Sequence, residues 1–550
     1  MASGASFSSS KVIIVGAGFS GLAMACQLKR ELMCDDFVIY DRDDGFGGTW
    51  LANKYPGCGV DIPAAFYSLS FAPNPNFSNF YPKRDEVLQY INSVVSKYDL
   101  SRHLVGNTEW VGASWQDDDK TWLVKLRSTT SGKEYTQRCN ILVSAVGALT
   151  NPNSLEVPGV DRFQGDIIHT ARWDQSVSLR DKNVIVLGNG ASATQLVPAV
   201  AKDARSITQF MRSKQYFLPG GSNAAISPFW QSIFRYVPGV LLAVRFLIFL
   251  YLETSTLQFN LTKTGANMRR ETAEISKRYV KENAPEKYWP LLLADYQVGC
   301  KRRVFDHEGY VSTLNRDNVR LTDDEVIALS ERSVSTKSGA KYPADVIILA
   351  NGFSLTQYDT ELCGRGGRSR QEYWKEAGHI TAYHSIGMSE FPNFFYILGP
   401  NSGRGHTSAV FSIENYTDLI IRIIRPIIAG SAVSVEPDMS SEKAYNERLQ
   451  AALKNTVFNN TCRSWFIDPK TGYNWMIYPW SSFYMWWTTH VAGLDGWVYE
   501  VSLRILSELS IRVSNAIRMH MHSIPRQKRS PRSRLLLCVC APYYPPLLSV

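Results

Sequence analysis

The sequence predicts an α/β protein with two Rossmann-like domains, the second of which carries a helical insertion. Two observations support this fold class. A continuous apolar run ends in a glycine-rich turn near residue 15, and the same pattern returns near residue 187. The chain of 550 residues is also too long for one hydrophobic core.

The elements follow in order along the chain. Residues 12–15 predict a buried strand, a helical pattern continues to about Leu32, and residues 37–40 predict a second strand. Residues 184–187 and 207–211 repeat the strand pattern. The segment 217–296 is aromatic-rich and helical in pattern, which predicts an insertion. We therefore expect a disordered N-terminus (1–10), a first domain from two pieces (11–155 and 350–500), a second domain (156–349) and a disordered basic tail (501–550).

Charge and cysteine patterns exclude several classes of protein. Residues 501–550 hold eight basic residues and one acid, so they supply +7 of the net +9 and leave only +2 for the rest. A nearly neutral body does not favour nucleic-acid binding. The nine cysteines include no Cys-x-x-Cys pair, which argues against a metal site, a dithiol redox centre and a secreted disulfide scaffold. Reduced thiols and a cytoplasmic location are the expectation.

One apolar stretch raises the question of a membrane. It runs from Val237 to Leu252, begins with a proline at position 238 and contains Arg245. Sixteen residues are few for a spanning helix. A buried helix is the favoured interpretation, and a peripheral membrane contact is the alternative.

The first glycine-rich turn has the spacing Gly-x-Gly-x-x-Gly, with Gly16, Gly18 and Gly21 between a strand and a helix. The first glycine permits the tight turn, the second lets the backbone approach a pyrophosphate, and the third packs helix on strand. Asp41 follows the second strand, where an acid binds a ribose hydroxyl. The turn therefore predicts a dinucleotide site.

The second turn has Gly188, Gly190 and Ala193, again directly after a strand. The next strand ends in Arg212 and Ser213 rather than in an acid. An arginine there favours a 2′-phosphate and hence NADPH. Two dinucleotides without a thiol pair indicate hydride transfer from NADPH to a flavin, so FAD is assigned to the first turn.

A motif before the second turn resembles a known family. Phe163, Gly165, His169, Trp173 and Asp174 satisfy the pattern F-x-G-x-x-x-H-x-x-x-W-[PD], which is similar to the fingerprint of type I Baeyer–Villiger monooxygenases. The resemblance covers roughly residues 11–500. It implies that His169 acts in the relative motion of the two domains and not in bond-making.

The same resemblance implies further site residues. Gly48, Thr49 and Trp50 match a flavin-contacting motif, and Asp61 and Tyr67 resemble the segment beside the flavin ring. Lys301 would contact the NADPH 2′-phosphate. Arg302 would stabilise a C4a-peroxyflavin, and Asp61 would hold Arg302 in place. Asn351 departs from the threonine usual in the family's interdomain turn.

The resemblance implies that a ketone, O₂ and NADPH give an ester or lactone and water, as in fungal secondary metabolism. Three alternatives stay open. A flavin N-hydroxylase or epoxidase is disfavoured by the Trp173-Asp174 ending, and a dithiol reductase by the absence of Cys-x-x-Cys. The third is a catalytically inactive relative that acts as a binding protein.

Overall fold

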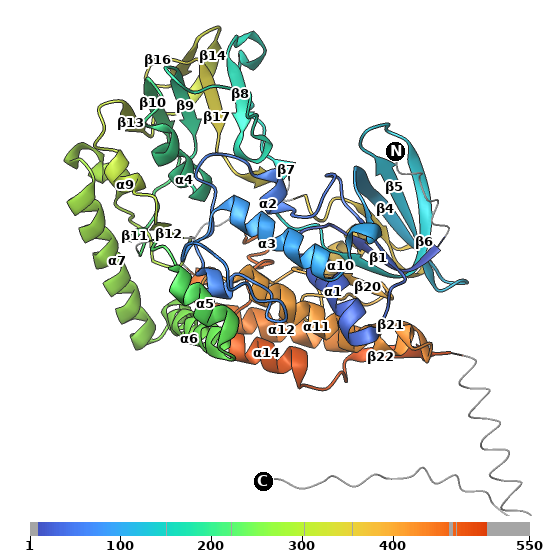
Figure 1. Ribbon diagram of the computed structural model, residues 1–550. Coiled ribbons are helices and arrows are strands. Elements are labelled where there is room, and N and C mark those ends of the chain that lie inside the picture. Colours follow the sequence, from blue (N-terminus) through green and yellow to red (C-terminus); the bar gives the residue numbers. More distant parts are fainter. Residues whose placement is uncertain are drawn as a thin grey trace, which may run out of the picture. The chain divides into compact units, whose positions relative to one another are not determined.

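The computed structural model describes residues 9–502, except Thr150, Ser222, Arg302, Leu355, residues 461–465 and Pro469. The described residues up to Glu500 belong to one compact unit. Two sheets organise this unit (Figure 1). Each contains a strand that leads into one of the glycine-rich turns. The α/β fold class with two Rossmann-like sheets is confirmed.

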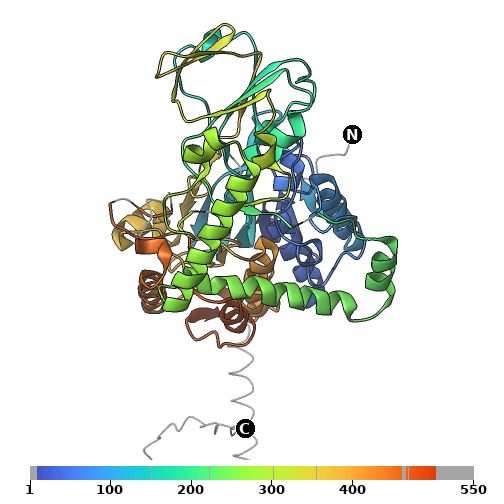
Figure 2. The ribbon, with the colours of Figure 1, turned by 90° about the vertical axis from the view of Figure 1, so that its left-hand side faces the viewer.

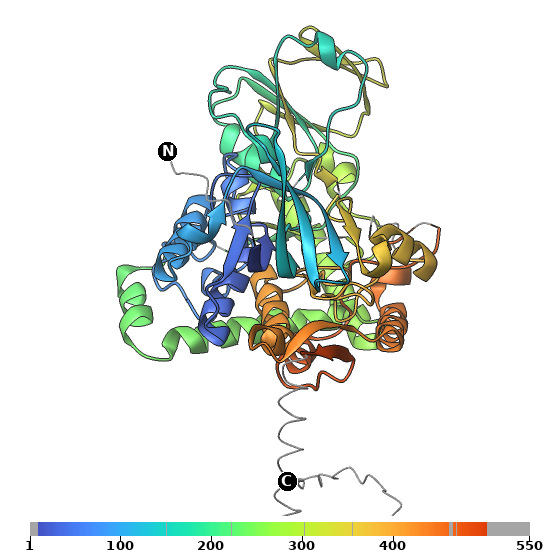
Figure 3. The same cartoon turned by 90° about the vertical axis from the view of Figure 1, so that its right-hand side faces the viewer.

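The first sheet has a parallel centre and an antiparallel extension. β1 lies between β2 and β6, parallel to both, with Val12 opposite Phe37 and Ile141. Because β1 is buried on both faces, its apolar side chains form an unbroken run. Figure 3 shows β4, β5 and β6, which pair antiparallel and which the sequence analysis did not predict. The strands are β1 (Ser9–Val15), β2 (Phe37–Tyr40), β3 (Leu104–Val105), β4 (Thr108–Gln116), β5 (Thr121–Ser128), β6 (Glu134–Ser144), β19 (Glu361–Cys363) and β20 (Phe394–Tyr396).

The second sheet is parallel throughout, in the order β13-β10-β9-β17-β8. A small antiparallel sheet of three strands, β14 to β16, extends this part of the chain. The strands are β8 (Asp166–His169), β9 (Asn183–Leu187), β10 (Ser206–Phe210), β13 (Val319–Thr322), β14 (Val326–Ser330), β15 (Ser333–Thr336), β16 (Lys341–Pro343) and β17 (Val346–Leu349).

Helices cover the sheets at the glycine-rich turns and at the C-terminal part. The glycine-rich turns open α1 (Phe19–Leu32) and α4 (Ala191–Val200), while α3 (Arg84–Lys97) and α10 (Arg370–Ala377) follow later strands. The C-terminal part consists of α11 (Ala409–Ile428), β21 (Ala432–Pro437), α12 (Met439–Lys454), α13 (Val457–Asn460), α14 (Ser482–His490) and β22 (Trp497–Val501). Since β1 begins at Ser9 and β22 reaches Val501, regular structure extends slightly beyond both expected limits. Residues 503–550, expected to be disordered, lie outside the described residues.

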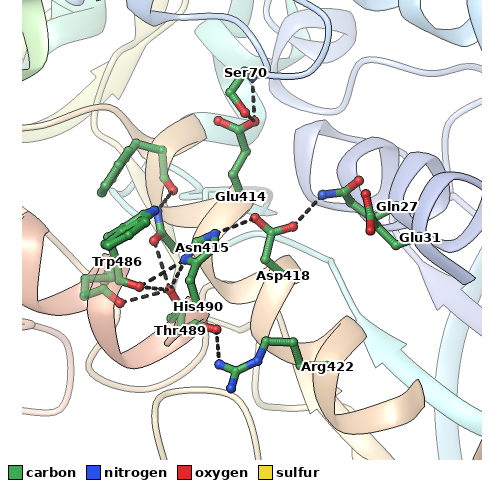
Figure 4. A network of polar contacts seen from close by, with 12 residues as sticks. Gln27, Glu31, Ser70, Glu414, Asn415, Asp418, Arg422, Trp486, Thr489 and His490 are labelled. Atoms are coloured by element: carbon green, nitrogen blue, oxygen red, sulfur yellow. Dashed lines mark hydrogen bonds and ion pairs between the residues drawn. The ribbon is translucent and has the colours of Figure 1, made fainter. Parts of the chain in front are cut away.

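The long helix α11 holds α1 and α14 through a polar network (Figure 4). Asp418 of α11 accepts a hydrogen bond from Gln27 of α1 (2.5 Å) and lies 3.1 Å from His490 Nε2 of α14. Thr489 Oγ1 donates to Asn415 Oδ1 (3.0 Å). The network fixes which face of α14 points inward.

The insertion begins and ends with a strand rather than being helical throughout. β11 (Phe217–Pro219) pairs in parallel with β12 (Val304–Asp306), so the two ends of the insertion lie side by side. Between and after them lie α5 (Pro228–Tyr236), α6 (Val240–Thr254), α7 (Lys263–Asn283), α8 (Trp289–Leu292) and α9 (Tyr310–Thr313). Figure 2 shows α6 in green at the edge of the fold, next to α7.

The favoured interpretation of the apolar stretch as a buried helix is wrong. Within α6 only Leu241, Arg245 and Phe249 are buried, and the other side chains are partly or fully exposed. α6 with the turn after it, residues 240–259, is long and apolar enough to cross a membrane by length and composition, although the span contains both Arg245 and Glu253. The sequence showed apolar composition, but composition alone does not say which neighbours cover a helix.

Candidate functional site

The two glycine-rich turns have the same geometry. Gly16 and Gly188 have φ of +109° and +121°. A Cβ on either would meet a backbone carbonyl oxygen of a neighbouring segment, at 2.4 Å from Ala145 and 2.2 Å from Ala350. Both positions therefore require glycine for the turn and for close packing.

The second glycine of each turn, unlike the first, has space around it for a side chain. Gly18 and Gly190 precede α1 and α4 with nearly identical extended backbones, φ −76° and −79°. A Cβ on Gly190 would meet nothing within 4 Å, and one on Gly18 would be in ordinary contact with Gly48 Cα at 3.6 Å. The chain thus has glycine at two positions where its own packing does not require glycine. We call the backbone at Gly18 the first cradle and that at Gly190 the second cradle. Each leaves room for a pyrophosphate at the start of the helix that follows.

The third position of each turn, Gly21 or Ala193, is packed against neighbouring parts of the chain. Gly21 fits against Gly16, whose carbonyl oxygen would lie 1.9 Å from a Cβ there. Ala193 is fully buried in α4. Asn189 Nδ2 donates to Ser213 O (2.7 Å), which ties the second turn to the loop after β10.

Asp41 lies at the end of β2, beside the first turn. Its Oδ2 accepts a hydrogen bond from Ala17 N–H (2.6 Å) and its Oδ1 from Asp43 N–H (2.9 Å). Burial raises the pKa of Asp41, and these two N–H groups act in the opposite direction. The carboxylate is therefore held at the turn, with acceptor capacity left on both oxygens for a hydroxyl donor.

Aromatic side chains gather beside the first turn. Tyr67 lies edge-on to Phe19 (5.6 Å between ring centroids) and to Trp50 (5.7 Å). Trp50 belongs to the short helix α2 (Thr49–Ala52), which Gly48 precedes with φ +51°. A Cβ on Gly48 would lie 2.8 Å from Gly18 Cα. The structure brings Gly18, Gly48, Trp50 and Tyr67 together beside the first turn, and Thr49 follows Gly48 at the start of α2.

The loop after β10 gathers positive charge. Arg212 is exposed and Ser213 is partly exposed. Lys214, which the sequence analysis did not single out, forms an ion pair with Asp295 (3.0 Å). Tyr296 OH donates to Lys214 O (3.3 Å), and Lys301 Nζ lies 4.8 Å above the Tyr296 ring. Lys301 therefore lies on the same side of the domain as the loop that follows β10.

The loop of residues 55–59 in the first domain contacts α4, the helix that follows the second glycine-rich turn. Tyr55 OH donates to Gln195 Oε1 (2.8 Å), and Gln195 Nε2 donates to Gly59 O (3.0 Å). Gly57, at φ +85°, lies so close that a Cβ would be 2.3 Å from Gln195 O. Gln195 was not predicted, because no local pattern marks a residue that bridges two domains.

Asp61 follows this loop and lies near His307. The carboxylate favours the charged imidazole, but burial dominates and lowers the pKa of His307. The His307 and Tyr81 rings lie against each other, tilted by 37°, with centroids 3.9 Å apart. Arg302, the proposed partner of Asp61, lies outside the described residues, so this pairing stays a prediction.

Arg303 contacts the segment that contains His406. Arg303 Nη1 donates to Gly405 O (3.3 Å), and His406 Nε2 lies 3.2 Å from Glu253 Oε2 of α6. Burial lowers the pKa of His406. Burial also favours the neutral form of Glu253, but hydrogen bonds from His406 and Ser482 outweigh it and lower the pKa of the carboxyl. Glu253 was missed because it directly follows the apolar stretch of residues 237–252, where no local pattern marks it.

The His169 motif lies at the crossing between the domains. There β7 (Asn151–Pro152) pairs antiparallel with β18 (Phe353–Ser354). His169 Nδ1 accepts from Ala171 N–H (3.0 Å), so the ring proton is on Nε2 and donates to Gly352 O (3.1 Å). Burial lowers the pKa of His169, which keeps the ring neutral. The segments around β7 and β18 are the two linkers between the domains. His169 thus connects β8 to the linker that contains Gly352 and β18.

The other residues of the motif support the same segment. A Cβ on Gly165 would lie 2.2 Å from Asp345 O and 2.7 Å from the Phe163 ring. Trp173 packs against the main core. Asp174 is exposed, and its Oδ1 accepts from Ser176 N–H and Oγ–H (2.8 and 2.7 Å). Asn351 Nδ2 donates to Ser154 O (3.2 Å), so the departure from threonine adds a contact between the linkers.

The described residues offer no metal site, and their cysteines are of two kinds. No group of three or more His, Cys, Asp or Glu side chains in the described part of the chain could hold a metal ion. Five described cysteines are free, whereas Cys300 is disulfide-bonded, contrary to the expectation that all thiols are reduced. The free cysteines are Cys26, Cys34, Cys58, Cys139 and Cys363.

Comparison with known proteins adds independent findings. Residues 14–83 match the model of the NAD(P)-binding Rossmann-like domain. The chain is 33% identical to the FAD-binding monooxygenase ktnD of Aspergillus niger over 474 residues, 84% of this chain and 77% of that protein. It is 31% identical to a Baeyer–Villiger monooxygenase of Pseudomonas aeruginosa over 474 residues, 85% and 87% of the two chains.

A solved structure agrees with this similarity. The oxidized steroid monooxygenase bound to NADP superposes with a TM-score of 0.77 at 27% identity, over 90% of this chain and all of that one.

Proposed function

Because the chain belongs to the family of FAD-binding and Baeyer–Villiger monooxygenases, we propose that it oxygenates a small-molecule ketone to an ester or lactone. The chain is a flavin-dependent monooxygenase whose cofactors are FAD and NADPH. In the proposed reaction, ketone, O₂, NADPH and a proton give ester or lactone, water and NADP⁺. A role in secondary-metabolite biosynthesis is part of the proposal.

One observation carries the proposal further than the family does. The loop at Tyr55 and Gly57, beside the first cradle, lies directly on α4, which opens from the second cradle. Two dinucleotides held in these cradles would therefore approach each other across this contact. Hydride transfer requires such an approach.

We assign the cofactors by domain. Residues 11–155 and 350–500 would bind FAD, because β19 and β20 return to the first sheet. Residues 156–349 would bind NADPH, because β8, β9, β10, β13 and β17 build the second sheet. Bound FAD would supply the activation of O₂ after reduction by NADPH.

The chain's own residues would bind the two cofactors and stabilise the charge that develops during oxygenation. The backbone at Gly18 and Gly190 would accept the pyrophosphates, and Asp41 would accept a ribose hydroxyl. Arg212 and Lys301 would bind the 2′-phosphate, and Ser213 and Lys214 line the same loop. Arg302, oriented by Asp61, would place a permanent positive charge at the oxygen that attacks the ketone and at the tetrahedral adduct that follows.

A peripheral membrane contact through residues 237–252 also belongs to the proposal. It is supported by the exposed side chains of α6.

The test is a ketone panel with purified protein. The protein should show a flavin spectrum, consume NADPH and yield products heavier than the ketone by one oxygen atom, identified as esters. The matched variants are Arg302→Ala and Arg303→Ala, and only the first should abolish ester formation. An oxygenated amine would favour the N-hydroxylase alternative. A colourless protein that leaves NADPH unchanged would favour a binding protein.

A further inference from the structure

A broad apolar surface lies on three helices of the chain. Tyr236 of α5, Leu242 and Tyr251 of α6 are 73%, 67% and 75% exposed, and Trp487 of α14 is 54% exposed. We call this the three-helix face. Its exposed apolar side chains are Phe229, Trp230, Tyr236, Leu242, Phe246, Leu247, Tyr251, Phe483, Trp486 and Trp487.

The three helices form one surface. α5 and α6 pack on each other. The rings of Phe249 (α6) and Phe483 (α14) meet edge-on with centroids 4.9 Å apart, and Glu253 Oε1 accepts from Ser482 N–H (2.8 Å). The contacts of Thr489 and His490 with α11 hold the other side of α14 inward (Figure 4). The exposed rings of α14 and the exposed leucines of α6 are therefore fixed parts of the fold.

The face is almost free of charge. Residues 228–261 contain three charged side chains, Arg235, Arg245 and Glu253. Arg245 is buried, Glu253 is partly buried and only Arg235 is exposed. Exposed apolar patches of this kind on a folded protein mark an interaction site.

The buried charges decide how the face would meet a membrane. Arg245 Nη1 donates to Ala65 O and to Ser68 O (2.5 and 3.0 Å), and Glu253 is bonded to His406 and Ser482. Both charged groups lie on the inner side of α6 and are satisfied by the protein. Crossing a bilayer would strip them of these partners at a large cost. α6 is therefore suited to lie on a membrane and unsuited to span one.

We propose that the three-helix face docks on a lipid bilayer, with α6 in the plane of the membrane. The exposed side chains are the Trp, Tyr, Phe and Leu that settle at the boundary between headgroups and acyl chains. Charge complementarity favours a bilayer with anionic lipid, because Arg235, the one exposed charged side chain among residues 228–261, is positive. The proposal extends the expected contact of residues 237–252 to α5 and α14 and sets its orientation.

The experiment adds full-length, FAD-loaded protein to preformed vesicles and separates bound protein by flotation. The vesicles contain either phosphatidylcholine alone or phosphatidylcholine with phosphatidylserine. The variants are Phe246→Glu/Leu247→Glu on α6 and Trp487→Glu on α14. Ile327→Glu on β14 is the matched control, since Ile327 is 46% exposed and β14 lies far from α6 (Figure 1).

The wild type should float with vesicles, more with anionic lipid, and stay bound at about 1 M salt, where charges are screened beyond about 3 Å. Both face variants should weaken binding at least about tenfold, and Ile327→Glu should bind like wild type. Brominated lipid should quench wild-type tryptophan fluorescence at the same salt, a readout that needs no variant to fold.

Four results would overturn the proposal. They are no binding by the wild type, binding that high salt abolishes, variants that bind like wild type, and a dimer that Phe246→Glu/Leu247→Glu dissociates in a protein that does not bind vesicles. The last result would assign the face to a second copy of the chain. None of these measurements depends on turnover, so they stand apart from the test of the proposed reaction.

Discussion

Exchanging the second glycine of each turn is the sharpest perturbation that the structure offers. Gly190→Val places a side chain where the protein has no atom within 4 Å, on a backbone with φ −79° that valine adopts without strain. The fold and FAD binding should therefore persist. The new side chain would occupy the space proposed for the NADPH pyrophosphate.

The expected loss of NADPH affinity follows from the hydrogen bonds that the pyrophosphate would lose. Hydrogen bonds from backbone N–H groups to a charged phosphate are each worth about 1.5–3 kcal/mol. Displacing the phosphate from two such donors at the start of α4 costs about 3–6 kcal/mol. The apparent affinity for NADPH should fall at least about a hundredfold.

Gly18→Val is the reciprocal control, because Gly18 has the same backbone conformation and ordinary contact distances. It should give folded protein without FAD, whereas Gly190→Val should give yellow protein with impaired NADPH use. The assay measures flavin content by absorbance and the rate of anaerobic flavin reduction against NADPH concentration. The reasoning is refuted if Gly190→Val protein is reduced with wild-type NADPH dependence, or if Gly18→Val protein retains FAD.

Three further predictions concern single charges. Arg212→Ala should raise the KM for NADPH about ten- to a hundredfold and leave that for NADH nearly unchanged; equal losses with both coenzymes would show that Arg212 does not bind the phosphate. Arg302→Ala should stay yellow and be reduced by NADPH at a normal rate, yet yield hydrogen peroxide in place of ester, because one such charge contributes about 3–4 kcal/mol to the oxygenation step; a normal ester yield would remove Arg302 from the catalytic role. Burial raises the pKa of Glu414, a carboxyl that accepts hydrogen bonds from Ser70, from 4.5 to about 7. The folded state therefore binds the proton more tightly, so stability falls as the pH rises from about 4.5 to 7, by an amount on the order of 3 kcal/mol. Glu414→Gln should remove this slope in denaturant titrations, and an unchanged slope would contradict the assignment.

The sequence predicted those parts of the fold that rest on local patterns. The apolar runs became β1, β2, β9 and β10 within a few residues, and the helix expected to end near Leu32 is α1. Parallel strands that are buried on both faces leave unbroken apolar runs, which is why these elements were recognisable.

Other features depend on contacts between distant residues and had no such pattern. Gln195 bridges to Tyr55 across 140 positions, and Glu253 reaches His406 across 153. The exposure of α6 was mispredicted for the same reason, since an apolar helix looks alike in sequence whether protein, lipid or water covers it.

The proposed reaction transfers one atom of O₂ to a ketone. Incubation of the purified protein with NADPH and a ketone that it accepts, under oxygen-18 gas, followed by mass analysis of the product, tests this transfer. We expect an ester or lactone that carries one oxygen-18 atom. A product without the label, or NADPH oxidised with hydrogen peroxide as the sole oxygen product, would contradict it.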